Sequence, residues 1–533
     1  MRRSVCTLLL AVVSVSMLGA RAASAQGLAY PTRTPYEIKA IGVEPGDPTP
    51  VSNVAGNKPG TLAVNFPWDF YEPNLYTPPC PASPDWIQYD GHCYYIQPSI
   101  DAHIKAYQAW GVRITGILYG VPAWARTGLG SACTPAFTGG DRFCKPDNPA
   151  DFARFAGMIA NRYNGITIHN GGTARIADFV IHNEVNRNEW FDIGCGQGVP
   201  CNQTTWLDVY AANFNAAYDR IKAEQVQAKV FVSVNNEWSN ADNPNGGTLS
   251  GRTVVAGLAA RAGSRAWSVA VHPYTTNMAS PVFTVDDAPY VTPGTIGQVA
   301  GWLRATYPST PSAWEIHMTE GGLDGNTWNE SAQSWYLCEA FRNVLGTPGV
   351  ENYIYTPLPE HPGLYPYGWY HGLKRMDGSW KPAWSTWALA NRIDVGITSC
   401  GFDRLPYVKL TRYYNPSRGH WVSTRLAPAG STTEAWWGLL REPQAATHMI
   451  YECAVNVPGS GYSGTHTFLD RLPTCGGLQP MGPLGYAYDG PGSGRLPLYR
   501  CRVGPGYSHF ASTDPNCEGQ AMEDLLGYVI SPF

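Results

Sequence analysis

The strongest constraint on the fold is a regular alternation of strand-like and helix-like segments between residues 36 and 393. Eight segments combine short apolar runs with β-branched or aromatic residues: 36–43, 61–66, 112–119, 178–184, 229–234, 267–271, 314–319 and 350–355. Helical spacing occupies most of the gaps between them: 100–110, 147–163, 205–224, 252–261, 296–307, 330–345 and 382–393. This alternation is typical of parallel strands joined by crossover helices.

Eight strands with intervening helices predict an α/β fold of the (β/α)8 TIM barrel type. Polar and aromatic residues cluster directly after the strands, where such barrels carry their functional residues. An open, doubly wound sheet is the structural alternative. It is disfavoured because no glycine-rich phosphate loop follows the first strand.

The sequence changes character after Cys400, where short strand-like segments separated by Gly and Pro replace the helical periodicity. One pattern then occurs three times, each copy with an opening, a His-led middle and a closing segment. The copies are 410–413, 420–424 and 437–440; 450–453, 466–470 and 484–487; 498–501, 509–513 and 526–529. A threefold all-β repeat predicts a small β-trefoil-like domain, and another three-bladed arrangement would fit it too.

We therefore expect three parts: a signal peptide at 1–25, a barrel domain at 26–398 and the all-β domain at 405–533. Residues 1–25 combine two arginines, an apolar run and the small residues Ala23-Ser24-Ala25, which is the pattern of a secretory signal. The apolar run is too short to span a membrane. These features predict a secreted protein, extracellular or periplasmic, without membrane contact, and we expect a monomer.

Thirteen cysteines become twelve when Cys6 is removed with the signal, and an even number in an exported chain predicts disulfides. Sequence proximity and the repeat suggest these pairs: Cys80 with Cys93, Cys133 with Cys144, Cys195 with Cys201, Cys453 with Cys475, Cys501 with Cys517, and Cys338 with Cys400. A metal site is the alternative, but the sequence contains neither a CxxC pair nor HExxH.

The charge pattern argues against a nucleic-acid partner. Only 15% of residues are charged, the formal net charge is −4, and runs of Lys or Arg are absent, whereas nucleic-acid binding needs a basic patch. The chain has 19 Trp and 31 Tyr residues. Aromatic rings stack on sugars but also fill large cores, so this composition favours a sugar ligand only weakly.

Two predicted strands lead to a glutamate. Segment 178–184 runs through apolar positions into Asn183 and Glu184, and segment 314–319 is followed by Glu320. In a barrel these are the fourth and seventh strands, whose carboxyl ends meet at one mouth. Two carboxyl groups about 5–5.5 Å apart can act as the acid and the nucleophile that cleave a glycosidic bond with retention.

This arrangement resembles the clan A glycoside hydrolases, which have an Asn-Glu pair after strand four and a Glu after strand seven. The resemblance covers residues 36–395. It implies that Glu184 is the acid/base, that Glu320 is the nucleophile and that Asn183 bonds the sugar 2-hydroxyl. The clan often has an aromatic partner of the nucleophile after strand six, and Tyr274 matches that position.

Other carboxylates compete for these roles, and rim glutamates paired to Arg or Lys are the ordinary structural alternative. We expect Glu189 on the loop after the fourth strand and Glu315 inside the seventh. Glu237 belongs to a second Asn-Glu pair, after the fifth strand, and is expected to be a subsite or structural residue. A wider carboxylate pair that includes Glu237 would give inversion instead.

Further residues at the strand ends are candidates for contact with the substrate: His272, Trp68, Trp124, Asn236, Trp238 and Trp369. His182 and His317 are expected to be buried and hydrogen-bonded. Asp286 and Asp287 are expected on a solvated loop rather than at a metal. No metal and no cofactor are expected, because the two-carboxylate reaction needs none.

The sequence and the resemblance together predict a retaining β-glycoside hydrolase acting on an extracellular polysaccharide or oligosaccharide. Long loops at the strand ends favour endo-action, and the repeat domain is expected to bind carbohydrate, although its repeated His could equally serve packing. A non-catalytic glycan-binding protein with a degenerate barrel is the alternative. The presence of Glu184, Glu320 and Tyr274 argues against it. An esterase or protease is disfavoured because no GxSxG elbow occurs.

Overall fold

The computed structural model describes residues 37–43, 57–128, 133, 140–169, 172–196, 198–326, 329–390, 407–456, 465–504 and 508–532. Eight parallel strands close into a barrel in the order β1-β10-β9-β8-β7-β6-β5-β2. Their bounds are β1 (Lys39–Val43), β2 (Thr61–Pro67), β5 (Arg113–Tyr119), β6 (Asp178–Ile181), β7 (Lys229–Val234), β8 (Trp267–Val271), β9 (Ile316–Met318) and β10 (Val350–Tyr355). The predicted barrel is thereby confirmed.

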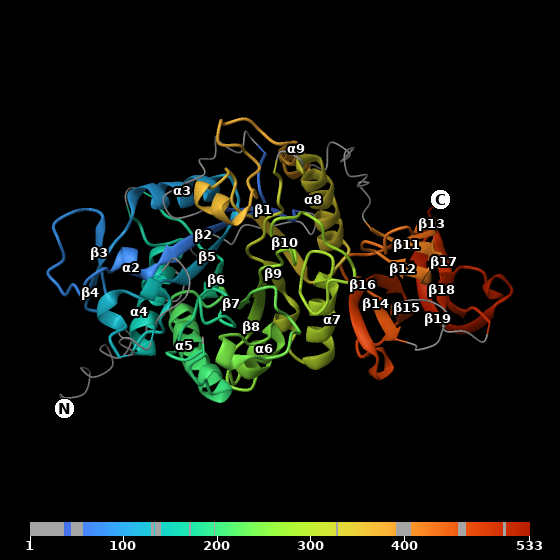
Figure 1. The fold of residues 1–533 in the computed structure, drawn as a ribbon, viewed down its shortest axis with the longest axis horizontal. Coiled ribbons are helices and arrows are strands. Elements are labelled where there is room, and N and C mark those ends of the chain that lie inside the picture. Colours follow the sequence, from blue (N-terminus) through green and yellow to red (C-terminus); the bar gives the residue numbers. More distant parts are fainter. Residues whose placement is uncertain are drawn as a thin grey trace, which may run out of the picture.

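Seven helices of the described ranges lie between or after these strands as predicted, and α2 (Trp68–Tyr71) was not predicted (Figure 1). The seven are α3 (Pro98–Ala109), α4 (Pro149–Arg162), α5 (Gln203–Glu224), α6 (Gly251–Ala259), α7 (Ile296–Thr306), α8 (Glu330–Leu345) and α9 (Pro382–Leu389). Asn148, Asn202 and Ser250 cap α4, α5 and α6 through side-chain acceptors, as N-cap residues do. A hairpin of β3 (Trp86–Tyr89) and β4 (His92–Tyr95) was not predicted.

The barrel interior is filled by alternate strand residues. Ala40, Val180 and Phe231 belong to one buried apolar cluster inside the barrel, so the barrel is a packed core rather than a pore. His317 of β9 lies against the Phe231 ring, 4.4 Å between centroids, and bonds Asn352. The predicted burial of His317 is confirmed. A functional site must therefore lie above this core, at the strand ends.

The C-terminal region is an antiparallel sheet with three strands from each repeat. The strands are β11 (Val408–Asn415), β12 (Gly419–Ser423), β13 (Thr432–Leu439), β14 (Thr447–Asn456), β15 (Thr465–Asp470), β16 (Gln479–Tyr488), β17 (Arg495–Arg502), β18 (His509–Ser512) and β19 (Ala521–Ile530). In every repeat the first strand pairs with both the second and the third. The threefold repeat is confirmed, and its trefoil character stays a prediction.

The strand register corrects the sequence alignment of the second repeat by one residue. In the first repeat, His420 of β12 lies three positions before the last residue of β12 that pairs with β11. In the third repeat, His509 of β18 lies three positions before the last residue of β18 that pairs with β17. The same position on β15 is held by Thr467, not His466. The aromatic residue that follows the histidine in the other two repeats therefore corresponds to Phe468 in this repeat. The repeated histidine is present in only two of the three repeats.

The two regions contact each other through α7 and α8 on the barrel side (Figure 1). Arg441 is 3% exposed and donates to the carbonyl oxygens of Val344 at 2.9 Å and Val350 at 2.8 Å. Thr424 donates to the Gly346 carbonyl at 2.6 Å. These bonds give side-chain donors to carbonyl groups at and after the end of α8; the Val344 carbonyl also accepts from the Thr347 N–H at 3.3 Å. The predicted domain boundary itself falls within 391–406, outside the described residues.

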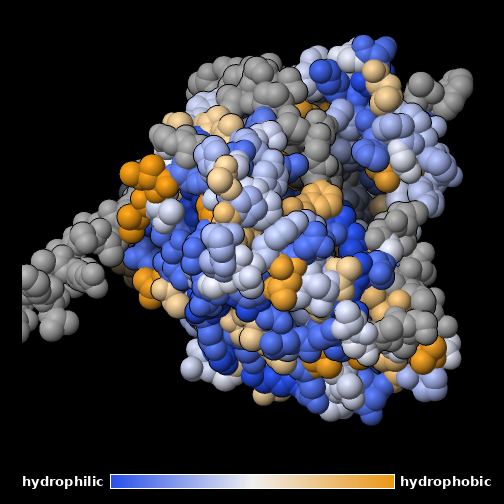
Figure 2. Space-filling view, turned by 90° about the vertical axis from the view of Figure 1, so that its left-hand side faces the viewer, coloured by the Kyte–Doolittle hydropathy of each residue, from blue (hydrophilic) through white to orange (hydrophobic). Residues whose placement is uncertain are grey.

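Disulfides join Cys80 to Cys93, Cys133 to Cys144, Cys195 to Cys201, Cys453 to Cys475 and Cys501 to Cys517, as predicted. Cys338 is also disulfide-bonded, and Cys400 lies outside the described residues, as does the predicted signal peptide. Within the described part of the chain, no helix has the length and apolar character needed to cross a membrane. On the face opposite the C-terminal region, hydrophobic residues form small separate groups (Figure 2).

Candidate active site

The backbone bends sharply between β6 and Glu184. Strand β6 ends at Ile181, and both His182 and Glu184 adopt positive φ, 59° and 39° respectively. This left-handed region costs a residue with a Cβ about 1–2 kcal/mol. The Glu184 N–H donates to the hydroxyl of Ser233 on β7 at 3.2 Å, which anchors the bend. Strain of this kind is concentrated at functional sites.

His272, at the end of β8, joins the two predicted catalytic glutamates. Its Nδ1 lies 2.7 Å from Oε1 of Glu184 and 3.6 Å from Oε2 of Glu320. Its Nε2 lies 3.1 Å from the hydroxyl of Thr319. The imidazole is fully buried, so the two carboxylates meet over one ring that has no contact with solvent.

The charges around His272 favour its protonated form. Burial alone would lower the pKa of His272, but the charge of Glu320 and the hydrogen bond and charge of Glu184 outweigh it and raise the pKa. A positive charge here interacts favourably with both carboxylates. His182 behaves differently, because burial lowers its pKa to about 3 and no carboxylate opposes the effect. His182 packs on Phe152 as a neutral core residue.

Tyr274 contacts the second glutamate. Its hydroxyl donates to Oε1 of Glu320 at 2.6 Å, and its ring stacks against His371, 5.8 Å between centroids. Burial raises the pKa of Glu320; the charge of His272 and the Tyr274 hydrogen bond oppose this rise, while the charge of Glu184 adds to it. Glu320 therefore ionises at a higher pH than an ordinary glutamate.

Both glutamates line a cleft of about 540 Å³ at the C-terminal ends of the strands. The loops after β6 to β10 surround it. Among the predicted contact residues, Asn236, Tyr274 and Trp369 line the cleft with the glutamates. The site lies where barrel enzymes carry theirs.

Three of the predicted contact residues do not reach this cleft. Trp68 and Trp238 are 0% and 1% exposed, so neither has a free ring face for a sugar. Trp124 packs edge-on against Trp68 and donates to the carbonyl of Glu72 at 3.1 Å. All three belong to the packing around the barrel instead. Their position at strand ends suggested contact, but Trp68 and Trp238 are buried and Trp124, partly buried, packs against the core.

The predicted sugar contacts of His272 and Asn183 also need revision or further support. His272 is buried beneath the carboxylates, so it can act on a ligand only through them, and the predicted direct sugar contact is corrected. Asn183 is 5% exposed and is not one of the described residues that line the cleft. Its resemblance-based role as a 2-hydroxyl ligand stays a prediction that depends on this small exposed surface.

Several cleft residues were not predicted from the sequence. Arg187, Trp190 and His371 line the cleft, and each follows a strand within a loop that the sequence marks only as long and polar. Trp190 directly follows Glu189 on the loop after β6, so the nearness to Glu184 was the available signal. His371 comes from the distant loop after β10, where the sequence offered none.

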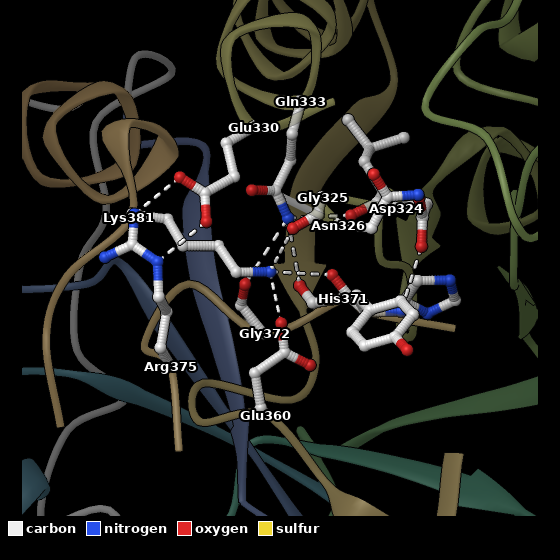
Figure 3. Close-up of polar contacts among 12 residues, drawn as sticks. Asp324, Gly325, Asn326, Glu330, Gln333, Glu360, His371, Gly372, Arg375 and Lys381 are labelled. Atoms are coloured by element: carbon white, nitrogen blue, oxygen red, sulfur yellow. Dashed lines mark hydrogen bonds and ion pairs between the residues drawn. The ribbon is translucent and has the colours of Figure 1, made fainter. Parts of the chain in front are cut away.

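Buried polar contacts hold the segment around His371 in place (Figure 3). Gln333 of α8 donates to the His371 carbonyl at 3.3 Å. Lys381 donates to the Gly325 carbonyl at 2.6 Å and forms a buried ion pair with Glu360. These contacts join the loop after β9 to the loop after β10, so one side of the cleft has a rigid support.

The competing carboxylates are engaged elsewhere. Glu315 lies directly before β9 and pairs with Lys229 at the start of β7, at the opposite end of the barrel. Glu189 and Glu237 line the cleft, but both form ion pairs with Arg187 at 2.9 Å. In the described residues, no group of three or more His, Cys, Asp or Glu is arranged to hold a metal ion.

The fold and the site define a (β/α)8 barrel protein with a facing glutamate pair beyond β6 and β9. More particularly, the chain belongs to a family described as a family of unknown function, DUF5722, whose model matches residues 77–394. A comparison with the curated proteins finds no match.

Solved structures to which this chain is similar include a family 39 glycoside hydrolase from Bacteroides cellulosilyticus WH2, at 12% identity and TM-score 0.46, over 94% of this chain and 83% of that one. A glucosidase from Croceicoccus marinus has 12% identity and TM-score 0.44, over 82% and 92%. The GH39 enzyme from Xanthomonas axonopodis pv. citri has 14% identity and TM-score 0.43, over 91% and 92%.

Proposed function

We propose that this protein is a secreted retaining β-glycoside hydrolase that cleaves an extracellular polysaccharide or oligosaccharide. Glu184 would be the acid/base and Glu320 the nucleophile. The carrying observation is that both carboxylates lie within 3.6 Å of one buried imidazole nitrogen while lining an open cleft. Two carboxylates held this close repel each other, and the charge of the protonated His272 offsets that repulsion.

The spacing of the pair favours retention over inversion. Oε1 of Glu184 and Oε2 of Glu320 cannot lie further apart than the sum of their distances to Nδ1 of His272. Such closeness suits the separation of about 5–5.5 Å between the carboxyl groups of retaining enzymes better than the about 6.5–9.5 Å of inverting enzymes, which leaves room for a water. Glu237, which would supply a wider pair, is held by Arg187.

The reaction follows from these positions. In the first step Glu320 attacks the anomeric carbon while Glu184 donates a proton to the leaving oxygen, which gives a glycosyl ester and a free alcohol. In the second step Glu184 takes a proton from water, the water oxygen attacks the same carbon, and Glu320 leaves. His272 engages Oε1 of Glu184, so the transferred proton would reside on Oε2.

The finer features of the proposal have separate support. Endo-action is favoured by the long loops that follow five of the strands and line the cleft. Secretion is supported by the disulfides, which persist in oxidising compartments. The trefoil-like repeat domain would bind carbohydrate and raise the effective concentration of polymer at the cleft.

A hydrolysis screen on plant, fungal and bacterial polysaccharides tests this function. Glu320→Gln is the blank, because an amide cannot form the glycosyl ester. Glu330→Gln is the matched control, because Glu330 pairs with Arg375 outside the cleft. Sugar release by wild type and Glu330→Gln, but not by Glu320→Gln, is expected. Binding to a polymer without release by any protein would favour the non-catalytic alternative.

A further inference from the structure

The charged groups that line the cleft are mostly acidic. Four carboxylates face it, those of Glu184, Glu189, Glu237 and Glu320, together with one guanidinium, that of Arg187. No lysine occurs among the described lining residues. Two of these carboxylates are needed for the proposed reaction. The proposed reaction does not use the other two, Glu189 and Glu237, or Arg187.

The arginine is fully engaged by the two additional carboxylates. Nε and Nη2 of Arg187 donate to Glu189 at 2.9–3.1 Å, and Nη1 donates to Oε1 of Glu237 at 2.9 Å. Burial would lower the pKa of Arg187, but these two carboxylates outweigh it and raise the pKa. Its positive charge is therefore permanent, and it is already balanced within the protein.

The balance leaves surplus negative charge. The second oxygen of Glu237, Oε2, is buried without a hydrogen-bond partner among the described residues. His371 adds little positive charge, because burial lowers its pKa, and its Nε2 donates to the Met278 carbonyl at 2.8 Å. The imidazolium of His272 is buried beneath Glu184 and Glu320, out of reach of a ligand. A negatively charged ligand would thus meet carboxylates and, among the described lining residues, no Lys or Arg that is not already paired, and like charges repel.

We propose that Glu189, Arg187 and Glu237 form a selectivity device that excludes glycans carrying carboxylate or sulfate groups. The substrate class is then an uncharged or amino-sugar glycan. This inference rests on the proposed function, because it assigns the ligand of the same cleft. Trp190 and Trp369 line the cleft too, and their rings suit the apolar faces of uncharged sugars.

The device also explains why an arginine lies in a cleft without serving as an anion site. Free guanidinium groups bind carboxylates with two parallel hydrogen bonds. Here Glu189 already occupies that side of Arg187 with both of its oxygens. An acidic sugar would have to displace a carboxylate held by the protein itself, so the site selects against it.

The test compares one ligand with and without its charge. Binding of an oligogalacturonate and of its methyl ester is measured by calorimetry at low salt in the Glu320→Gln background, where no turnover occurs. The decisive protein adds Glu189→Gln and Glu237→Gln, which release Arg187. We expect this protein to bind the acid at least tenfold more tightly than its parent does, with the ester changed less than threefold.

A further substitution, Arg187→Met, serves as the control and should remove the gain. Thermal unfolding of each protein checks that it is folded. No gain for the acid in the double substitution, or a parent protein that prefers the acid to the ester, would overturn the proposal. Because binding is measured without hydrolysis, a failed polysaccharide screen would count against the proposed function alone.

Discussion

Nδ1 of His272 lies 2.7 Å from Oε1 of Glu184, and this bond ties the end of β8 to the strained turn after β6. The imidazole is fully buried while the carboxylate reaches the cleft. A group that a ligand cannot touch therefore fixes the orientation of a group that it can. His272 is a positioning residue, and its charge also acts on Glu320.

Replacement of His272 by glutamine should lower kcat/KM and change its pH dependence. The imidazolium charge lowers the pKa of Glu320, so its loss should raise that pKa further. The nucleophile must be ionised, and activity is lost as pH falls through its pKa. The acidic limb of the profile should move to higher pH, with a loss on the order of 10²-fold from misplaced carboxylates. An unshifted profile with a uniform loss would indicate a structural role only.

Replacement of Tyr274 by phenylalanine tests the other contact of Glu320. The hydroxyl donates at 2.6 Å and lowers the Glu320 pKa, so its removal should also move the acidic limb to higher pH. One lost donor at a charged reacting group costs about 10²–10³-fold in kcat. The ring still stacks on His371, so thermal unfolding should change little. A variant with normal kcat would separate Tyr274 from the reaction.

Glu184→Ala should show a dependence on the leaving group. Aryl glycosides with acidic phenols leave without protonation, so the first step on them needs no general acid, whereas natural sugars do need one. The variant should therefore lose more activity on the polysaccharide than it loses in the first step on the activated aryl glycoside. Pre-steady-state release of phenol measures that first step. Equal losses on both substrates would contradict the acid/base role.

The barrel could be predicted because its information is local. Strands β7, β8 and β10 have the bounds that their apolar runs predict, and Asn148 caps α4 as its sequence suggests. Glu184 and Glu320 could be predicted to lie together because a closed barrel brings the strand ends together whatever the loops do. The position of Tyr274 was implied only by the family resemblance, and its hydroxyl does bond Glu320.

The remaining site could not be predicted because loop conformation decides it. Trp68 and Trp238 occupy strand ends just as Tyr274 does, yet both are buried. His371 reaches the site from a loop whose path depends on Gln333 and Lys381. Strand register is equally hidden, because Thr467 and not His466 takes the repeated position on β15. Which residues of two strands face each other cannot be read from the sequence of one short strand alone.

Arg441 provides a last prediction, on how far the barrel depends on the repeat domain. This buried side chain donates to the carbonyls of Val344 and Val350, and a cation near the end of a helix also interacts favourably with its dipole. Arg441→Met removes the guanidinium donor from both carbonyls, and the Val344 carbonyl then keeps only backbone donors such as the Thr347 N–H at 3.3 Å. A buried acceptor left unsatisfied costs about 1–3 kcal/mol, so we expect the free energy of unfolding to fall by about that amount.

Arg418→Met is the matched control, because Arg418 also joins the repeat domain to the barrel but pairs with the exposed Asp286. Exposed ion pairs contribute about 0–1 kcal/mol. Chemical denaturation followed by tryptophan fluorescence measures both variants. If Arg441→Met is no more destabilising than Arg418→Met, the repeat domain does not support α8. If Arg441→Met is the more destabilising, truncation after the barrel should lower the stability of the barrel domain.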